Sequence, residues 1–291
     1  QVPNVAQPEF PFYGLTPGLD QHINRSGGAS VNVLDFQSSK GTRKISMVTC
    51  YDYWSAQILE KTDIDCLLVG DSLAMVMHGY ESTVFAEIEL MALHVRAVAK
   101  GAPGKFIVGD MPFLTTRKGL QPTMDAVQTL MQAGANAVKV EGEVGQRELI
   151  AHIVESGVPV MGHLGLTPQS VNGFGGHKVQ GRNEADAEAL FASALGVAEA
   201  GCFALVLECV PASLARRISR TIEIPTIGIG AGPYTDGQVL VLQDMLGMNP
   251  EFKPKFLRQY GDGFSFVSGA VNRFHAETVG GCFPSKAESY G

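Results

Sequence analysis

The stretch Cys66–Leu73, CLLVGDSL, is an apolar run that ends on an acid, and Phe106–Pro112, FIVGDMP, repeats the pattern. Both runs are continuously apolar, which is typical of a strand covered on both faces, as in a parallel sheet. Both end in the dipeptide Gly-Asp. Buried strands usually end in uncharged turn residues, so a repeated acid at this place needs an explanation.

Similar apolar runs recur along the chain and alternate with amphipathic segments. The predicted strands are Ile45–Tyr51, Cys66–Gly70, Phe106–Gly109, Ala135–Val140, Val158–Gly162, Phe203–Leu207 and Thr226–Ile229, with a weaker eighth somewhere in Val239–Leu246. Seven or eight β/α units in series predict a (β/α)8 TIM barrel or an open doubly wound sheet. The barrel is favoured because the strands are evenly distributed and no G-x-G-x-x-G turn follows the first.

The remaining segments predict an arm and two extra helices. Residues 1–28 are rich in Pro and Gly and are expected to form an extended arm, with a single barrel domain over 29–291. A short helix is expected within Ser30–Phe36 and an extra C-terminal helix over Phe264–Thr278. The C-terminal helix carries an apolar face with Phe266, Val271 and Phe274, which we expect in a subunit contact or packed on the barrel.

Composition excludes several classes of protein. The chain of 291 residues is 45% hydrophobic with a formal net charge of −7, and it has no run of Lys and Arg, which argues against nucleic-acid and anionic-membrane binding. No apolar stretch approaches the roughly 18 residues of a membrane span. Five cysteines without a C-x-x-C pair, and no signal-peptide core, favour a reduced, cytoplasmic protein. A catalytic thiol is the less favoured interpretation of these cysteines.

The ends of five consecutive predicted strands carry ionisable residues. They are Asp71, Asp110, Lys139 with Glu141, His163 and Glu208. In a barrel the carboxyl ends of the strands converge on one open face, where active sites lie. Singly, either aspartate is explained equally well as a turn or capping residue, and the histidine as a hydrogen-bonded core residue. Together they indicate a functional site, because clustered unpaired charges are costly.

The residue types suggest a chemistry. Carboxylates without a Cys/His cluster suit Mg²⁺, which takes oxygen ligands. Such a metal can chelate a 2-oxo acid and stabilise an enolate, while Lys139 neutralises the substrate carboxylate. Glu208, on an apolar strand beside Cys209, is a candidate general base. The residues alone therefore predict Mg²⁺-dependent enolate chemistry in a barrel.

Two glycine-rich stretches leave alternatives open. GIGAG, Gly228–Gly232, follows the seventh predicted strand and either forms a tight turn, which we favour, or binds a phosphate. NGFGGHKVQG, Asn172–Gly181, is either a connection or an active-site lid.

Several stretches resemble the ketopantoate hydroxymethyltransferase family. They include LLVGDSLAMV, AGANAVKVEG, LVLECVP and the highly specific GHLGLTPQSVNGFGGHKVQGR over Gly162–Arg182, and they run in family order from about Ile45 to the C-terminal helix. The resemblance implies a barrel of the phosphoenolpyruvate/pyruvate type. It also implies transfer of a one-carbon unit from 5,10-methylenetetrahydrofolate to 3-methyl-2-oxobutanoate, giving 2-dehydropantoate for pantothenate and coenzyme A synthesis.

The resemblance further implies roles for individual residues. The Mg²⁺ ligands are Asp71, Asp110 and Glu141, the last directly or through water. The contacts to the oxo acid are Asp71, Ser72, Asp110 and Lys139. Glu208 is the proton acceptor at C3, and His163 lies close to the substrate without an assigned role. A homo-oligomer is expected, commonly a decamer of five dimers.

Two other functions are compatible with a barrel of this kind. A Mg²⁺-dependent lyase or mutase of the same fold is expected to carry a cysteine motif in a mobile loop, and the sequence shows none. A catalytically inactive barrel that serves as a binding module would not need Asp71, Asp110, Lys139 and Glu208 together.

Overall fold

The structure is a computed structural model that describes residues 31–170 and 178–290. The predicted arm over 1–28 and residues 172–177 of the glycine-rich connection or lid lie outside the described residues. Among the residues that are described, no helix is both long enough and apolar enough to cross a membrane.

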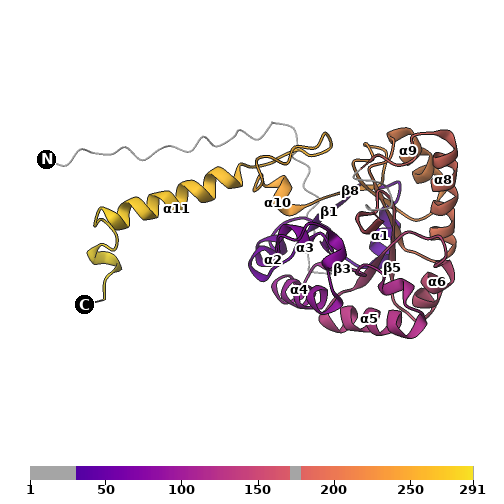
Figure 1. Ribbon diagram of the computed structural model, residues 1–291, viewed down its shortest axis with the longest axis horizontal. Helices are drawn as coiled ribbons and strands as arrows, with labels where there is room; N and C mark the ends of the chain where they lie inside the picture. The colour runs from indigo at the N-terminus through magenta and orange to yellow at the C-terminus, as the bar shows by residue number, and fades with distance from the viewer. Residues whose placement is uncertain (1–30, 171–177, 291) are drawn as a thin grey trace.

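Eight parallel strands close into a barrel, which confirms the predicted fold and rules out the open sheet (Figure 1). The strands are β1 Ile45–Thr49, β2 Cys66–Val69, β3 Phe106–Asp110, β4 Ala137–Glu141, β5 Val160–Gly165, β6 Ala204–Glu208, β7 Thr226–Ile229 and β8 Gly237–Leu240. Each strand pairs with the next in the sequence, and β1 pairs with β8, Ile45 lying opposite Gly237. All side chains at the carboxyl ends of the strands therefore share one rim.

Helices surround the barrel and bury its outer face (Figure 1). The longer ones are α2 Tyr53–Glu60, α4 Ile88–Gly101, α5 Leu120–Ala133, α6 Arg147–Glu155, α8 Glu184–Glu199 and α9 Ala212–Thr221. Short elements after the strands are α3 Leu73–Val76, η1 Thr83–Phe85, η2 Thr115–Arg117, η3 Pro168–Ser170 and α10 Leu242–Met245; η4, Lys286–Glu288, lies near the C-terminus. Alternation of apolar strands and amphipathic helices produces this two-layer core.

The predicted first helix is found as α1, Val33–Ser39. It begins later than expected because Asn32 caps it, accepting hydrogen bonds from the backbone N–H groups of Leu34 and Asp35. Phe36 is buried inside the barrel, with ring centroids 5.4 Å from Phe106 and 5.6 Å from Phe203. Since both partner rings lie at strand starts, α1 closes the amino-terminal end of the barrel and leaves the other end for chemistry.

The eighth strand lies earlier than predicted. It runs over Gly237–Leu240, and the later part of the predicted segment forms α10. A Cβ atom at Gly237 would lie 2.5 Å from the carbonyl oxygen of Ile45, so only glycine lets β8 close against β1. A strand that begins with a glycine is hard to recognise, because glycine is depleted in strands.

The C-terminal helix α11, Gly263–Val279, is confirmed but does not pack on the barrel. It extends away from the barrel (Figure 1), and none of its residues is buried. Phe266, Val271 and Phe274 are 70%, 58% and 55% exposed. Packing of this face on its own barrel, one of the two expected outcomes, is therefore wrong.

Candidate active site

Strand register brings the predicted residues together at the carboxyl end of the barrel. Asp110 lies opposite Lys139 across β3 and β4, and Glu141 lies opposite His163 across β4 and β5. Across β5 and β6, Glu208 lies opposite Gly165. Of these ionisable residues, Asp110, Lys139 and His163 are each at most 4% exposed. One polar cluster thus forms at the rim from strands that are far apart in sequence.

The Gly-Asp repeat places two aspartates side by side. The backbone N–H of Asp71 donates to Asp110 Oδ2 over 3.0 Å. A Cβ atom at Gly70 would lie 3.1 Å from Ser72 Oγ and 3.5 Å from Asp110 Oδ2, so glycine leaves room for this close approach. Asp110 therefore binds the end of the neighbouring strand instead of capping its own loop.

Lys139 is the positive centre of the cluster. Its Nζ lies 3.2 Å from Asp110 Oδ2, 3.9 Å from Glu141 Oε1 and 3.1 Å from His163 Nδ1. Burial lowers the pKa of this lysine, but the carboxylates of Asp110, Glu141 and Asp71 outweigh burial and raise it above its ordinary value. Lys139 is therefore a fixed cation.

His163 lies between two glutamates. Its Nδ1 is 3.3 Å from Glu141 Oε1 and its Nε2 is 3.2 Å from Glu208 Oε2. Burial and Lys139 lower its pKa, but the neighbouring carboxylates of Glu141 and Glu208 prevail and raise the pKa to about 9. The pKa of Glu141 is lowered in spite of burial, since His163, Lys139 and the backbone N–H of Gln169 all favour its charged form.

The two aspartates show the opposite behaviour. Burial raises the pKa of Asp71 well above its ordinary value, and the charges of Glu141 and Asp110 add to the rise. Burial also raises the pKa of Asp110, although Lys139 opposes it. The cluster thus has more negative charge than its two cationic side chains compensate.

The oxygen atoms of this cluster fit a hard cation such as Mg²⁺. Asp110 Oδ1 and Glu141 Oε1 are buried without a hydrogen-bond partner, an arrangement that costs free energy unless a ligand fills it. Over residues 31–170 and 178–290, no three His, Cys, Asp or Glu side chains already have the spacing of a metal site. Mg²⁺ usually takes only one or two carboxylates and completes its shell with water and substrate oxygens.

Two further residues contact this cluster and were not assigned from the sequence. Gln169 Nε2 donates to Asp71 Oδ2 over 2.8 Å. The hydroxyl of Tyr51, a fully buried residue just beyond β1, lies 2.7 Å from Ser72 Oγ. A charged residue at the end of an apolar run is recognisable in a sequence, whereas a neutral amide or a phenol carries no such signal.

The cysteines do not favour thiol chemistry. Cys209 directly follows Glu208, and burial together with the charge of Glu208 raises the pKa of its thiol to about 11. Burial raises the pKa of Cys202 to about 12. A nucleophilic cysteine needs a lowered pKa, so neither thiol suits that role.

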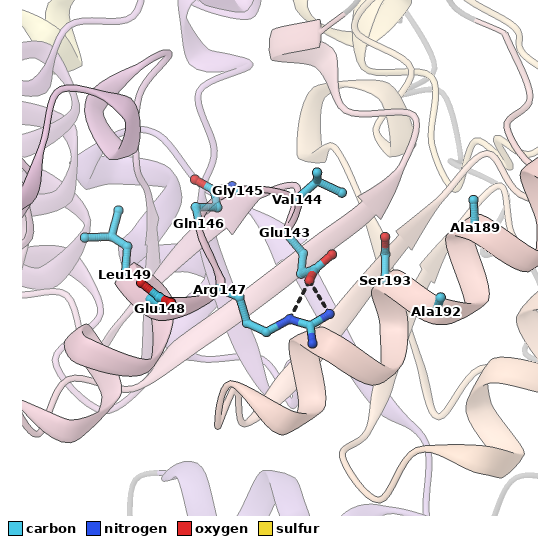
Figure 2. A pocket seen from close by; sticks show the side chains of 10 residues that line it. All are labelled: Glu143, Val144, Gly145, Gln146, Arg147, Glu148, Leu149, Ala189, Ala192 and Ser193. Atoms are coloured by element: carbon cyan, nitrogen blue, oxygen red, sulfur yellow. Dashed lines mark hydrogen bonds and ion pairs between the residues drawn. The ribbon is translucent and has the colours of Figure 1, made fainter.

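A cavity of 790 Å³ lies away from the acid cluster, between the start of α6 and the side of α8. In Figure 2, the side chain of Arg147 crosses this cavity and pairs with Glu143. Arg147 also contacts Glu199 on α8. The cavity is lined by a satisfied ion pair, and none of the strand-end residues faces it.

The barrel and its rim define a class of protein. A solved structure of 2,3-dimethylmalate lyase, a member of the PEP mutase/isocitrate lyase superfamily, matches with a TM-score of 0.53 and 13% identity over 84% of this chain and 98% of that one. This similarity supports the fold alone. The chain shares with that protein the (β/α)8 barrel fold that the sequence predicts.

Sequence comparison identifies the family within that class. The family model for ketopantoate hydroxymethyltransferase matches residues 30–286. The 3-methyl-2-oxobutanoate hydroxymethyltransferase of Bdellovibrio bacteriovorus is 56% identical over 89% of this chain and 98% of its own length. The enzyme of the same name from Coxiella burnetii (strain CbuG_Q212) is 55% identical over 88% of this chain and 97% of its own length. The chain belongs to the ketopantoate hydroxymethyltransferase family.

Proposed function

We propose that this enzyme transfers a hydroxymethyl unit from 5,10-methylenetetrahydrofolate to 3-methyl-2-oxobutanoate, giving 2-dehydropantoate for pantothenate and coenzyme A synthesis. Family membership supports the reaction. The observation that carries the mechanism is the buried rim cluster, in which Asp110 and Glu141 each keep one oxygen that accepts no hydrogen bond. Such a cluster suits a site that holds a cation and a 2-oxo acid together.

The proposed metal ligands are Asp71 and Asp110, with Glu141 binding directly or through water. When bound, Mg²⁺ polarises the oxo group and lowers the cost of the negative charge that develops as C3 loses its proton. Lys139 binds the substrate carboxylate, since its charge is fixed and its Nζ is already central. Ser72, held by Tyr51, is the remaining contact to the oxo acid.

Glu208 is the proposed base. It removes the proton from C3, and the resulting enolate carbon attacks the methylene carbon carried by the folate. Both carbon–nitrogen bonds from the methylene carbon to the folate break, one as the carbon–carbon bond forms and the other as water supplies the hydroxyl group of the product. The two folate nitrogens take up the proton from C3 and the proton that the water loses. His163, 3.2 Å from Glu208, lies where it can orient that carboxylate.

Exchange of the C3 proton into deuterated water tests the base. Glu208→Gln keeps the shape of the side chain but removes the base, so exchange is expected to slow at least about a hundredfold, with or without folate. Binding of the oxo acid and Mg²⁺ should stay near normal. The matched control is Glu199→Gln, which changes an exposed glutamate on α8 and should exchange at the parental rate.

Exchange at the parental rate in Glu208→Gln would show that another group is the base. The same assay separates the rival functions. A lyase or mutase would cleave or rearrange the oxo acid without folate, and an inactive barrel would not exchange the proton at all.

The enzyme is proposed to be a homo-oligomer, with a decamer as the expected size, located in the cytoplasm. The exposed apolar face of α11 supports assembly, because large exposed apolar patches mark interaction surfaces. The five free cysteines support a reducing compartment. Light scattering should give a multiple of 31.0 kDa, and Phe266→Asp with Val271→Asp should reduce the assembly. A 31.0 kDa monomer of the parent at micromolar concentration would refute the assembly.

A further inference from the structure

Gln169 contacts two of the three proposed metal ligands at once. It lies in η3, just after β5, and its Nε2 donates to Asp71 Oδ2 over 2.8 Å and to the carbonyl oxygen of Met111 over 3.0 Å. Its backbone N–H donates to Glu141 Oε2 over 3.1 Å. One short turn therefore contacts the carboxyl ends of β2, β3 and β4.

These contacts separate the carboxylate oxygens that accept hydrogen bonds from those that do not. Gln169 holds Asp71 Oδ2 and Glu141 Oε2, while Asp110 Oδ2 is held by the Asp71 backbone and by Lys139. The other oxygens of Asp110 and Glu141 accept no hydrogen bond, and Glu141 Oε1 has only its ion-pair contacts with His163 and Lys139. A carboxylate fixed through one oxygen presents the other in a defined direction, as donors around metal ligands commonly arrange.

We infer that Gln169 is a positioning residue that orients Asp71 and Glu141 for a hard divalent cation. This inference rests on the proposed function, since it requires that these carboxylates bind the metal. It goes beyond that function by assigning a task to a neutral residue outside the proposed ligand set. The side chain acts on Asp71, and the backbone N–H acts on Glu141 independently of the side chain.

Competition with the cation is the opposite role for Gln169, and it predicts the opposite change in metal affinity. An amide that occupies the place of the cation would compete with it, and removal of the amide would then strengthen metal binding. The geometry favours positioning, because Gln169 uses oxygens different from the two unpartnered ones.

The experiment is a titration of the purified full chain with Mn²⁺, followed by the loss of the free-ion electron paramagnetic resonance signal. It is repeated by calorimetry with Mg²⁺, each with and without 3-methyl-2-oxobutanoate. Gln169→Met keeps the side-chain length and removes the donor, and it is expected to weaken metal binding about 10–100-fold. At saturating Mg²⁺, turnover should recover toward the parental value, which a general loss of structure would not allow.

The matched control is Gln121→Met. Gln121 Nε2 donates to Asp125 Oδ1 over the same 2.8 Å, but on the exposed surface of α5. This variant should bind both metals as the parent does. Gln169→Ala provides a second removal of the donor, and thermal melting of each metal-free variant shows that the fold is retained.

The outcomes distinguish a failure of the positioning role of Gln169 from a failure of the proposed function. If the parent binds metal and both Gln169 variants bind it equally well or more tightly, the positioning role is wrong and the proposed function stands. If the parent binds neither metal, with or without the oxo acid, the proposed metal site is wrong and the role of Gln169 falls with it.

Discussion

Both ends of the barrel contain buried or partly buried aspartates, but the two ends use them differently. At the carboxyl end, Asp71 and Asp110 share Lys139 with Glu141, and burial raises the pKa of both aspartates. At the amino end, Asp65 and Asp236 each have a cation of their own. The same residue type thus forms a crowded site at one end and isolated structural contacts at the other.

Asp65 illustrates the structural use. It immediately precedes β2, and its Oδ2 accepts from the Ser46 backbone N–H at 2.9 Å, from Ser46 Oγ at 3.1 Å and from Arg43 at 3.0 Å. Burial raises the pKa of Asp65, but these hydrogen bonds outweigh it and lower the pKa. The charged form is therefore favoured in the folded protein.

Asp236 repeats the arrangement on the other side of the barrel closure. It immediately precedes β8, and its Oδ2 accepts from the Thr226 backbone N–H at 2.9 Å, from Thr226 Oγ1 at 3.1 Å and from Lys40 at 2.9 Å. An aspartate before a strand therefore ties it to the preceding strand, whereas an aspartate after a strand enters the cluster. Position relative to the strand, and not residue type, separates stability from function.

The largest expected effect comes from the crowded end. Asp71→Asn removes a proposed metal ligand, so turnover should fall at least about a hundredfold. The metal-free protein should unfold at a temperature no lower than the parent, because the substitution removes a carboxylate that burial and its neighbours disfavour. Turnover assays and thermal melting check the two parts. A clear loss of melting temperature would mean that Asp71 is structural, like Asp65.

At the amino end the pattern should be reversed. Asp65→Asn should lower the free energy of unfolding by about 2 kcal/mol, since hydrogen bonds to a charged group are each worth about 1.5–3 kcal/mol. Activity of the folded enzyme should remain. Because the pKa of Asp65 is lowered, its contribution is present above its ordinary value of 3.8 and is lost as the pH falls below that. Denaturant melts at pH 7 and pH 3.5 check this, and an equal difference at both would contradict it.

The smallest expected effect sharpens the comparison. Asp244 in α10 is half-buried, and burial alone raises its pKa to about 6. Its charged form is therefore disfavoured, so stability is lost as the pH rises from about 4 to about 6. Asp244→Asn should raise the melting temperature by about 1–2 °C at pH 8 and not at all below pH 4. A gain that persists at low pH would show that charge is not the cause.

The strand order and most strand bounds could be predicted because continuous Val, Ile and Leu runs recur between amphipathic helices. Thr226–Ile229 was placed correctly to the residue. β8 was misplaced because Gly237 is selected by a backbone contact with Ile45, which only the closed barrel reveals. Likewise, the position of α11 depends on its packing partner. Its apolar face alone could not show whether the helix packs on its own barrel or against a neighbouring subunit.

The candidate site could be predicted as a set of residues but not as a network. The position of Asp110 after an apolar run was sufficient to place it at the rim. The bridging contacts of Gln169 depend on how η3 returns over β2 and β4, which a local pattern does not contain. His163 could be placed near the site, but its location between Glu141 and Glu208 required the register of three strands.

The closure of the barrel has a consequence for the order of folding. Thr49 of β1 accepts a hydrogen bond from the backbone N–H of Leu242, a residue 193 positions later in the chain. During synthesis, β1 therefore waits for nearly the whole barrel before its second edge is covered. Until then it exposes an unpaired apolar edge, and such distant pairings make folding slow. We expect folding of the nascent chain to depend on protection of that edge, so that release of β8 from the ribosome sets when the rim cluster first forms.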